Sequence, residues 1–231
     1  ALLAEAWLLR RDGQALGVRL LCAALLLVGN WTYGRYRLHT LQTLPGPRVA
    51  VVQGNVPLPE RLASATTWQG ILAKHKDLAL QATQGKPTDL VCWPEATVLL
   101  SLDRSPEAMA SVREAARSLG APLLLGAPRD NRFNSAYLVT GRGVLGTYDR
   151  MRLVPFGEYI PGRAFGPWAK AAVWMAGSDS CLEPGGAQEH LVLETKGRSL
   201  KLGCFLCYEE AFPDLARRWA AQGADLLVTL S

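Results

Sequence analysis

The sequence lacks the patterns that identify several classes of protein. Its 25 Lys and Arg residues are scattered, and no block of like charges forms a basic arm or groove, although the formal net charge is +5. Nucleic acid is therefore not the expected partner. The five cysteines are odd in number and irregularly spaced, unlike the disulfide framework of a small secreted domain. Internal repeats and low-complexity tracts are also missing.

The two cysteines in "LGCFLC" do not form a convincing metal or redox pair. Cys204 and Cys207 are accompanied by no second C-x-x-C and no H-x-x-x-H, so a structural zinc site lacks its other ligands. On an extended strand their Cα atoms would lie about 10 Å apart, which is beyond the reach of a disulfide. Zinc binding and thioredoxin-like chemistry are both disfavoured.

What the sequence does contain is enough apolar residues for a sizeable core. With 231 residues, 49% of them hydrophobic, the chain can form one large domain without disulfides or metals. After the rigid linker "LPGPR", residues 45–231 alternate buried strands with helices and then form two hairpins, which predicts a mixed sheet and the α/β class. Strands are expected in "RVAVVQGNV", "TDLVCWPEA" and "APLLLGA", helices in "ATTWQGILAKHKDLALQAT" and "SPEAMASVREAARSLG", and hairpin turns at "TGRG" and "TKGR".

Residues 1–44 differ in kind from the rest and are predicted to be a membrane-associated segment. Their charge-free run, residues 20–29, is too short for a bilayer, which needs about 20 residues of helix. Extension to residues 15–33 reaches spanning length and adds only Arg19, which is near enough to one end to reach the headgroups. One transmembrane helix is therefore predicted at residues 15–34.

The residues around this helix leave its orientation open. Trp31 and Tyr33 lie where an interfacial belt is expected. Basic residues stand on both sides, namely Arg10, Arg11, Arg35 and Arg37. A cleavable signal peptide fits less well, because no A-x-A-like site follows the apolar run. A buried helix of a soluble protein has the same pattern and remains an alternative.

A long segment, residues 156–186, has neither a helical nor a strand period. It contains several prolines and many large apolar side chains, among them Trp168 and Trp174, which disfavours disorder. Loops of this length are commonly functional. We interpret the segment as an apolar flap over a site, with a satellite core packed on the sheet as the alternative.

Cys207 is predicted to end a buried strand, directly before a helix that begins in "YEEAFPDLARRWAAQ". A sulfur at that point meets backbone N–H groups and the positive end of the helix dipole, and both stabilise the thiolate. Cys204, inside the strand, is interpreted as a small core residue. Cys207 needs polar partners before it can be considered a nucleophile.

Candidate partners stand at equivalent strand ends. Glu95 follows the strand in "LVCWP", and Arg150 and Glu158 flank the end of another strand and the entry to the flap. Open α/β sheets place their sites at such ends. A carboxylate, a cation and a thiol together supply a base, an oxyanion partner and a nucleophile. A helix-start carboxylate at Glu95 and a surface ion pair between Arg150 and Glu158 are the alternative interpretations.

Three ordered motifs resemble the signatures of the nitrilase, or carbon-nitrogen hydrolase, superfamily. They are "WPEA", "YDRMRLVPFGEYIP" and "CYEEAFPDLARRWAAQGADLLV", and the likeness runs from about Arg48 to the end of the chain. The resemblance implies a catalytic set at Glu95, Arg150 and Cys207, supported by Glu158, Tyr208 and Glu209.

Within the superfamily, "LVPFGEYIP" with "CYE" resembles the apolipoprotein N-acyltransferases, bacterial membrane enzymes of lipoprotein maturation. The likeness implies an α-β-β-α sandwich, apparently incomplete at its C-terminus, behind a transmembrane helix and on the periplasmic side of the inner membrane. It also implies that an acyl chain passes from a phospholipid through a Cys207 thioester to the N-terminal amine of a diacylated lipoprotein. No metal or organic cofactor is implied. A flap with Trp168 and Trp174 suits both lipid substrates.

The sequence departs from the family pattern at two positions and in its extent. Arg150 stands where the family has lysine, and Arg152 stands where it commonly has histidine. A guanidinium can hold an oxyanion but cannot give up a proton, so the fold is more firmly implied than activity. Family members continue on both sides of this region, and the chain resembles an internal fragment. A soluble amidase and a catalytically silent homologue that binds lipid or a partner remain alternatives.

Overall fold

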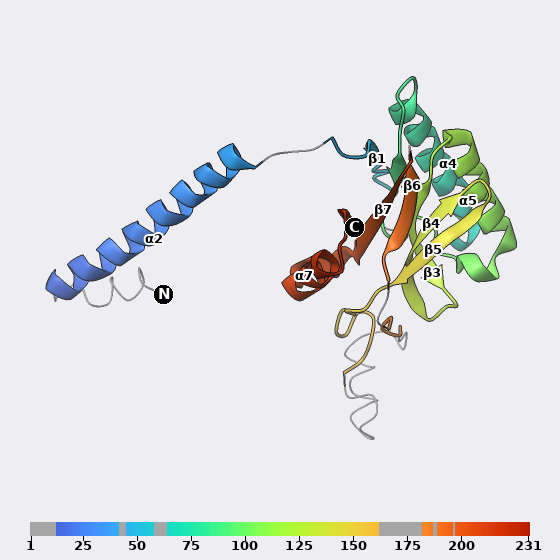
Figure 1. Cartoon of the computed structure of the whole chain (residues 1–231). Helices are drawn as coiled ribbons and strands as arrows, with labels where there is room; N and C mark the ends of the chain where they lie inside the picture. The colour runs from blue at the N-terminus through green and yellow to red at the C-terminus, as the bar shows by residue number, and fades with distance from the viewer. Residues whose placement is uncertain (1–12, 42–44, 58–63, 162–181, 187–188, 196) are drawn as a thin grey trace, which may run out of the picture. The chain divides into compact units, whose positions relative to one another are not determined.

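The computed structural model describes residues 13–41, 45–57, 64–161, 182–186, 189–195 and 197–231. It forms two compact units, residues 1–46 and 47–231 (Figure 1). Trp168 and Trp174 lie outside the described residues, as does most of the expected flap.

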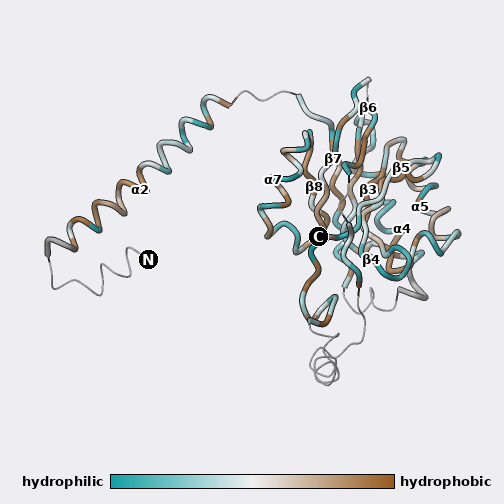
Figure 2. Tube along the Cα trace, turned by 60° about the horizontal axis from the view of Figure 1, so that its bottom comes forward, coloured by the Kyte–Doolittle hydropathy of each residue, from teal (hydrophilic) through white to brown (hydrophobic). Residues whose placement is uncertain are grey.

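The first unit contains α2, a helix of 28 residues from Gly13 to Thr40. Its section Leu16–Thr40 is long and apolar enough to cross a membrane, and 0% of the apolar window is buried. At about 1.5 Å per residue, a helix of this length exceeds the ~30 Å hydrocarbon core of a bilayer. The brown stretch along α2 in Figure 2 marks these apolar residues. Length and composition therefore fit a membrane span.

Two polar side chains of α2 are satisfied within the helix itself. Asn30 Nδ2 donates a hydrogen bond of 2.9 Å to the carbonyl of Leu26, and Thr32 Oγ1 donates one of 2.8 Å to that of Val28. Polar groups in lipid need such internal partners, because no water is present to replace them. These two residues are therefore compatible with a membrane environment.

The second unit contains a five-stranded sheet in the order β1-β2-β3-β4-β5. Strands β1, β2 and β3 are parallel, and β3, β4 and β5 are joined as antiparallel hairpins. The hairpin turn predicted at "TGRG" is confirmed, because it joins β4 to β5. The strands are β1 (Val49–Val51), β2 (Leu90–Cys92), β3 (Leu123–Arg129), β4 (Phe133–Thr140) and β5 (Gly143–Asp149).

Helices α4 and α5 cover one face of this sheet (Figure 1). Their bounds are α4 (Ser64–Thr83) and α5 (Pro106–Leu119), and the short η1 turn (Leu102–Arg104) precedes α5. Helix α5 ends at Gly120, as predicted, with a φ of 63° in the left-handed region that glycine adopts readily. Trp68 of α4 and Val112 of α5 belong to one apolar core with the sheet.

A three-stranded sheet follows, in the order β6-β7-β8. Its elements are β6 (Leu191–Thr195), β7 (Arg198–Leu206), η2 (Cys207–Ala211), α7 (Pro213–Ala221) and β8 (Leu226–Leu230). Helix α7 packs on β7, where Trp219 Nε1 donates to the carbonyl of Cys204 at 3.1 Å. Gly203 makes this approach possible, because a Cβ there would lie 2.6 Å from Trp219 Cγ.

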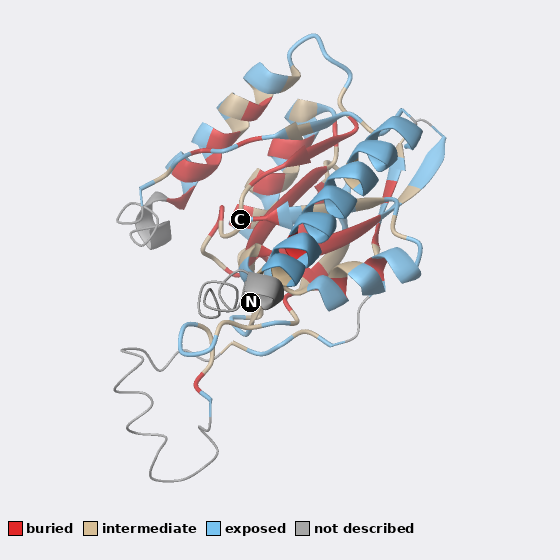
Figure 3. Ribbon diagram, turned by 90° about the vertical axis from the view of Figure 1, so that its left-hand side faces the viewer, coloured by how far each residue is buried: buried red, intermediate tan, exposed pale blue. Residues whose placement is uncertain are grey.

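The two sheets pack face to face, as the buried residues in Figure 3 indicate. One core joins Leu138 of the first sheet to Leu193 and Leu202 of the second. The layers are thus α4 and α5, the two sheets, and α7, which is the expected α-β-β-α sandwich. Cys92 and Cys204 lie in this core, and burial raises the pKa of the Cys92 thiol to about 12 and raises that of Cys204 as well. The core role predicted for Cys204 is confirmed.

One local expectation is wrong, because the α-helix does not begin directly after Cys207. The 3-10 turn η2 starts at Cys207, and α7 begins only at Pro213. Proline lacks an N–H and fits the first turn of a helix, while it restricts the preceding residue to extended backbone. Phe212 has that backbone, with φ −105° and ψ 93°. The dipole of α7 therefore does not end at Cys207.

Candidate active site

Polar residues next to the termini of three strands meet at one end of the first sheet. Glu95 lies in the turn after β2, Asn134 lies near the start of β4, and Arg150 directly follows β5. The turn that holds Glu95 passes very close to β3, since a Cβ on Gly126 would lie 2.7 Å from Glu95 Cα. Glycine at position 126 therefore lets the Glu95 backbone reach the sheet.

The guanidinium of Arg150 contacts two carboxylates. Its Nη1 donates to Glu95 Oε1 at 3.1 Å and to Glu158 Oε1 at 2.7 Å. Asn134 Nδ2 donates to the same two oxygens, at 2.7 and 3.3 Å. The side chains of Arg150, Glu95 and Glu158 are only 3%, 17% and 15% exposed. The alternative of a surface ion pair between Arg150 and Glu158 is therefore wrong.

The remaining contacts of Arg150 fix its position but leave one donor unused. Its backbone N–H bonds the carbonyl of Asn134 at 2.8 Å, and Nε donates to the carbonyl of Arg152 at 3.1 Å. Nη2 is buried and has no hydrogen-bond partner among the described residues. A buried donor without a partner is costly unless a ligand completes it. Nη2 of Arg150 is therefore a candidate for holding a substrate oxygen.

Glu158 is held by its own loop as well as by Arg150. Its Oε2 accepts a 2.8 Å hydrogen bond from the backbone N–H of Val154. Phe156, between the two, has a φ of 63°, which is uncommon for a residue with a side chain. The tight loop thus aims one oxygen of Glu158 at its own backbone and the other at Arg150. This arrangement suits a residue that orients the guanidinium.

Glu209 is fully buried and accepts hydrogen bonds from four groups. The donors are the backbone N–H groups of Leu206 (2.9 Å), Met151 (2.8 Å) and Arg152 (3.1 Å) and the hydroxyl of Tyr148 (2.9 Å). Burial raises the pKa of the Glu209 carboxyl, while these hydrogen bonds act in the opposite direction. Glu209 therefore ties the turn after β7 to the segment after β5.

Cys207 lies in that tied turn. It is half-buried and has a φ of 46°, a left-handed backbone that is strained for a residue other than glycine. Arg150 contacts Glu95 and Glu158 directly. Cys207 is connected to this cluster only indirectly, because Glu209, two residues after it, binds the backbone N–H groups of Met151 and Arg152, which follow Arg150. Such strain is common at functional positions.

A cavity of about 480 Å³ opens beside this turn. Tyr208, the residue after Cys207, lines it together with Phe212, and Leu182 and Pro184 line it from the segment before β6. Among the described lining residues only Arg152 is charged. Its Nη2 pairs with Asp214 Oδ2 at 3.0 Å, and both side chains are about half exposed, at 51% and 50%. An apolar chain with a polar end matches this lining.

One residue of the site, Asn134, was not predicted from the sequence. Asn134 belongs to none of the three motifs, yet it binds both carboxylates. The only feature of the sequence that could have indicated Asn134 is its position, as a polar residue at the start of the strand that pairs with the strand before Arg150.

Among the described residues, no three His, Cys, Asp or Glu side chains converge to hold a metal ion.

The family model described as carbon-nitrogen hydrolase matches residues 48–231. Apolipoprotein N-acyltransferases from Geobacter metallireducens and Azotobacter vinelandii are 31% and 34% identical over 89% and 97% of this chain. The chain covers 40% and 42% of the length of those two relatives.

Solved structures show the same fold. An amidase from Nesterenkonia sp. aligns with a TM-score of 0.53 at 23% identity, covering 82% of this chain and 67% of that one. A carbon-nitrogen hydrolase from Helicobacter pylori aligns with a TM-score of 0.52 at 19% identity, covering 79% and 59%.

Proposed function

Since the chain belongs to the carbon-nitrogen hydrolase family, we propose that it is part of an apolipoprotein N-acyltransferase. In this proposal residues 45–231 are the catalytic domain and residues 1–44 are membrane-associated. The names of relatives at 31% and 34% identity support the reaction. The observation that carries it is the apolar cavity beside the Cys207 turn, next to the buried cluster of Glu95, Arg150 and Glu158.

The first half-reaction forms a thioester. Glu95 takes the proton of the Cys207 thiol, and the thiolate attacks the ester carbonyl of a phospholipid. Nη2 of Arg150, which has no partner among the described residues, stabilises the oxyanion. The ester C–O bond then breaks, and the lysophospholipid leaves with the proton that Glu95 returns.

The second half-reaction forms an amide. The N-terminal amine of a diacylated lipoprotein attacks the thioester carbonyl, and Glu95 accepts a proton from the amine. The C–S bond breaks, and Glu95 returns the proton to the Cys207 sulfur, so that both residues regain their starting states. Arginine cannot act as a base at neutral pH, so this mechanism assigns every proton transfer to Glu95 and only charge stabilisation to Arg150.

The remaining residues position the reacting groups. Glu158 and Asn134 orient Arg150 through their bonds to the cluster. Glu209 holds the Cys207 turn, and Tyr208 lines the cavity that receives the acyl chain. Helix α2 anchors the protein in the bacterial inner membrane, and the catalytic domain faces the periplasm in this proposal.

The thioester is the step that tests the proposal. Full-length protein in detergent is incubated with phosphatidylethanolamine, and its peptides are analysed by mass spectrometry. We expect an acyl adduct on the Cys207 peptide that hydroxylamine removes, and no adduct in Cys207→Ser. Cys22→Ser is the matched control, because Cys22 is an exposed cysteine of α2 and its loss should leave the adduct intact. A protein that never acylates Cys207 contradicts the proposal.

A soluble amidase is the second candidate, because an amidase shares the fold at a TM-score of 0.53. The apolar lining of the cavity favours a lipid over a small amide. If the amidase function were correct, a short aliphatic amide would be hydrolysed and no acyl adduct would form from phospholipid.

A further inference from the structure

The segment 182–185 is fastened to the backbone of the candidate site. Leu182 N–H donates to the carbonyl of Glu158 at 2.7 Å, and Gly185 N–H donates to that of Arg150 at 2.8 Å. Between them, Glu183 N–H donates to the carbonyl of Arg132 at 2.7 Å. The segment therefore bridges the two chain regions that carry Arg150 and Glu158.

Neighbouring side chains of this segment have different surroundings. Leu182 and Pro184 line the cavity beside the Cys207 turn. Glu183, between them, is not among the described lining residues and instead pairs with Arg132. The same segment thus forms a wall of the cavity and carries an ionic group directed elsewhere.

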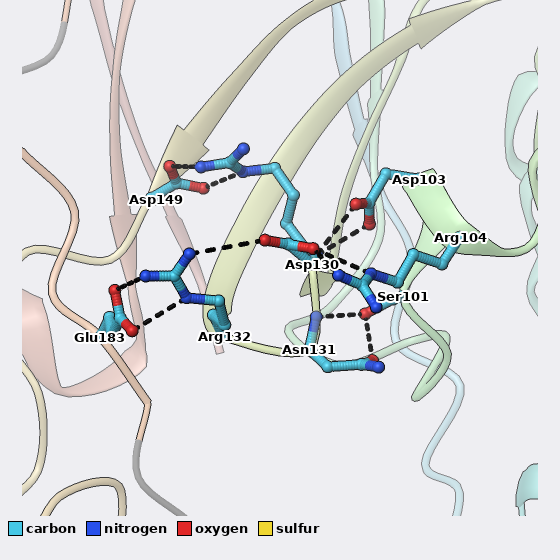
Figure 4. A network of polar contacts seen from close by, with 9 residues as sticks. Ser101, Asp103, Arg104, Asp130, Asn131, Arg132, Asp149 and Glu183 are labelled. Atoms are coloured by element: carbon cyan, nitrogen blue, oxygen red, sulfur yellow. Dashed lines mark hydrogen bonds and ion pairs between the residues drawn. The ribbon is translucent and has the colours of Figure 1, made fainter.

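The pair between Arg132 and Glu183 is bidentate. Nε of Arg132 donates to Glu183 Oε1 at 2.8 Å, and Nη2 donates to Oε2 at 2.5 Å. Figure 4 shows both contacts, with the arginine held between Glu183 and Asp130. The backbone N–H of Glu183 also donates to the carbonyl of Arg132, so the two residues are joined through both their side chains and their backbones.

Arg132 itself stands on a braced turn between β3 and β4. The backbone N–H of Asp130 donates to both oxygens of Asp103, at 2.9 and 3.0 Å, and that of Asn131 donates to Ser101 Oγ at 2.8 Å. Asp130 and Asn131 have φ values of 54° and 53°, which Asp and Asn tolerate better than most residues. Figure 4 places these contacts beside the Arg132 pair. These contacts fix the turn that carries Arg132 to Ser101 and to the η1 turn.

We propose that Arg132 and Glu183 form an ionic clamp that holds the cavity wall made by Leu182 and Pro184, and so determines how well the acyl donor binds. The two residues are positioning residues, because neither is among the described residues that line the cavity. The identity of the donor as a phospholipid rests on the proposed function. The clamp itself rests only on the contacts described above.

Backbone amide exchange tests the clamp without any assumption about activity. In full-length protein, Arg132→Glu and Glu183→Arg are each expected to speed hydrogen exchange of the Leu182, Glu183 and Gly185 amides about fivefold, in keeping with loss of an exposed pair. The double variant, with the charges exchanged, should restore the original rates. The exposed pair Glu114 and Arg117 on α5 is the matched control, and its charge exchange should leave these amides unchanged.

Kinetics with phosphatidylethanolamine test the effect on the cavity. We expect KM for the donor to rise about fivefold in each single variant while kcat stays within about twofold, and the double variant to recover, because substrate binding and not the reacting groups is disturbed. Unchanged exchange in the single variants, or no recovery in the double variant, overturns the clamp. Faster exchange with unchanged KM overturns its role in donor binding.

The clamp can be tested even if the proposed function is wrong. If the unaltered protein never acylates Cys207, the proposed function fails, and a fluorescent lysophospholipid then replaces the donor as a binding probe of the cavity. Weaker binding of that probe by about fivefold in the single variants supports the clamp. Equal binding in all variants overturns the role of the clamp in ligand binding.

Discussion

At the scale of residues, the question whether the protein is catalytically active or silent depends on Arg150. One of its nitrogens, Nη1, binds both carboxylates of the cluster, while Nη2 has no partner among the described residues. Arg150→Lys keeps the positive charge, so we expect Cys207 acylation to slow by no more than about tenfold. Arg150→Gln removes the charge and should slow it by about a hundredfold or more, as loss of an oxyanion donor does.

The acylation rate of Cys207, measured by mass spectrometry over time, checks this prediction. Arg142→Lys is the matched control, because Arg142 is exposed and lies outside the cluster. Activity that is absent from the original chain and arises only in Arg150→Lys would show that the natural protein is catalytically silent.

Glu209 provides a second test at the same scale, on stability. Its carboxylate accepts from four donors in a fully buried position. Glu209→Gln replaces an acceptor by an N–H₂ donor, so we expect the free energy of unfolding to fall by about 2–3 kcal/mol. Tyr148→Phe removes only one of the four donors and should cost about 1 kcal/mol.

Urea unfolding of the protein in detergent measures both changes. Equal costs for the two substitutions would contradict the view that the carboxylate joins the Cys207 turn to the segment after Arg150. Refolded Glu209→Gln protein should also acylate Cys207 more slowly, because the strained turn loses its support.

At the scale of elements, the packing of α7 on β7 depends on the absence of a side chain at Gly203. A Cβ there would lie 2.6 Å from Trp219 Cγ and 2.8 Å from Leu227 Cδ2. We expect Gly203→Ala to lower the free energy of unfolding by about 1–3 kcal/mol and to shift the fluorescence of buried Trp219. Gly70→Ala in α4 is the control, since a Cβ there meets nothing within 4 Å, and it should be neutral or stabilising. Similar losses in both variants would contradict the packing argument.

The elements also show what local sequence can predict. Apolar runs and helical spacing predicted the strands and helices of the sandwich, because burial of one face imposes those periods. The start of α7 was misplaced, because the effect of Pro213 on its neighbours outweighed the helix-forming residues before it.

The candidate site was predictable only where it lies at strand ends. Glu95 and Arg150 follow strands in the sequence and meet in the structure. Asn134 was missed because it lies near the start of a strand and does not follow one, and Arg132 and Glu183 were missed because both lie in connecting segments. No local period indicates such pairings. They become visible only when the hairpin of β3 and β4 places one segment beside another.

At the scale of the whole molecule, α2 is the element that predicts membrane attachment. The section Leu16–Thr40 fits a membrane span by length and composition. We therefore expect the full-length protein to remain in the membrane fraction after washing with high salt and to be released by detergent. Replacement of Leu25, Leu26 and Leu27 by lysine should prevent insertion, because each central lysine costs about 2.5–3.5 kcal/mol on translocon scales.

Fractionation followed by immunoblotting measures this attachment. The matched control replaces the exposed Val144, Leu145 and Val192 of the second unit by lysine, which should leave the protein in the membrane fraction. Release of the unaltered protein by salt alone would contradict the membrane span and favour a soluble amidase. Retention of the α2 variant would instead show that another part of the protein holds it at the membrane, because the substituted helix cannot remain in hydrocarbon with three added charges.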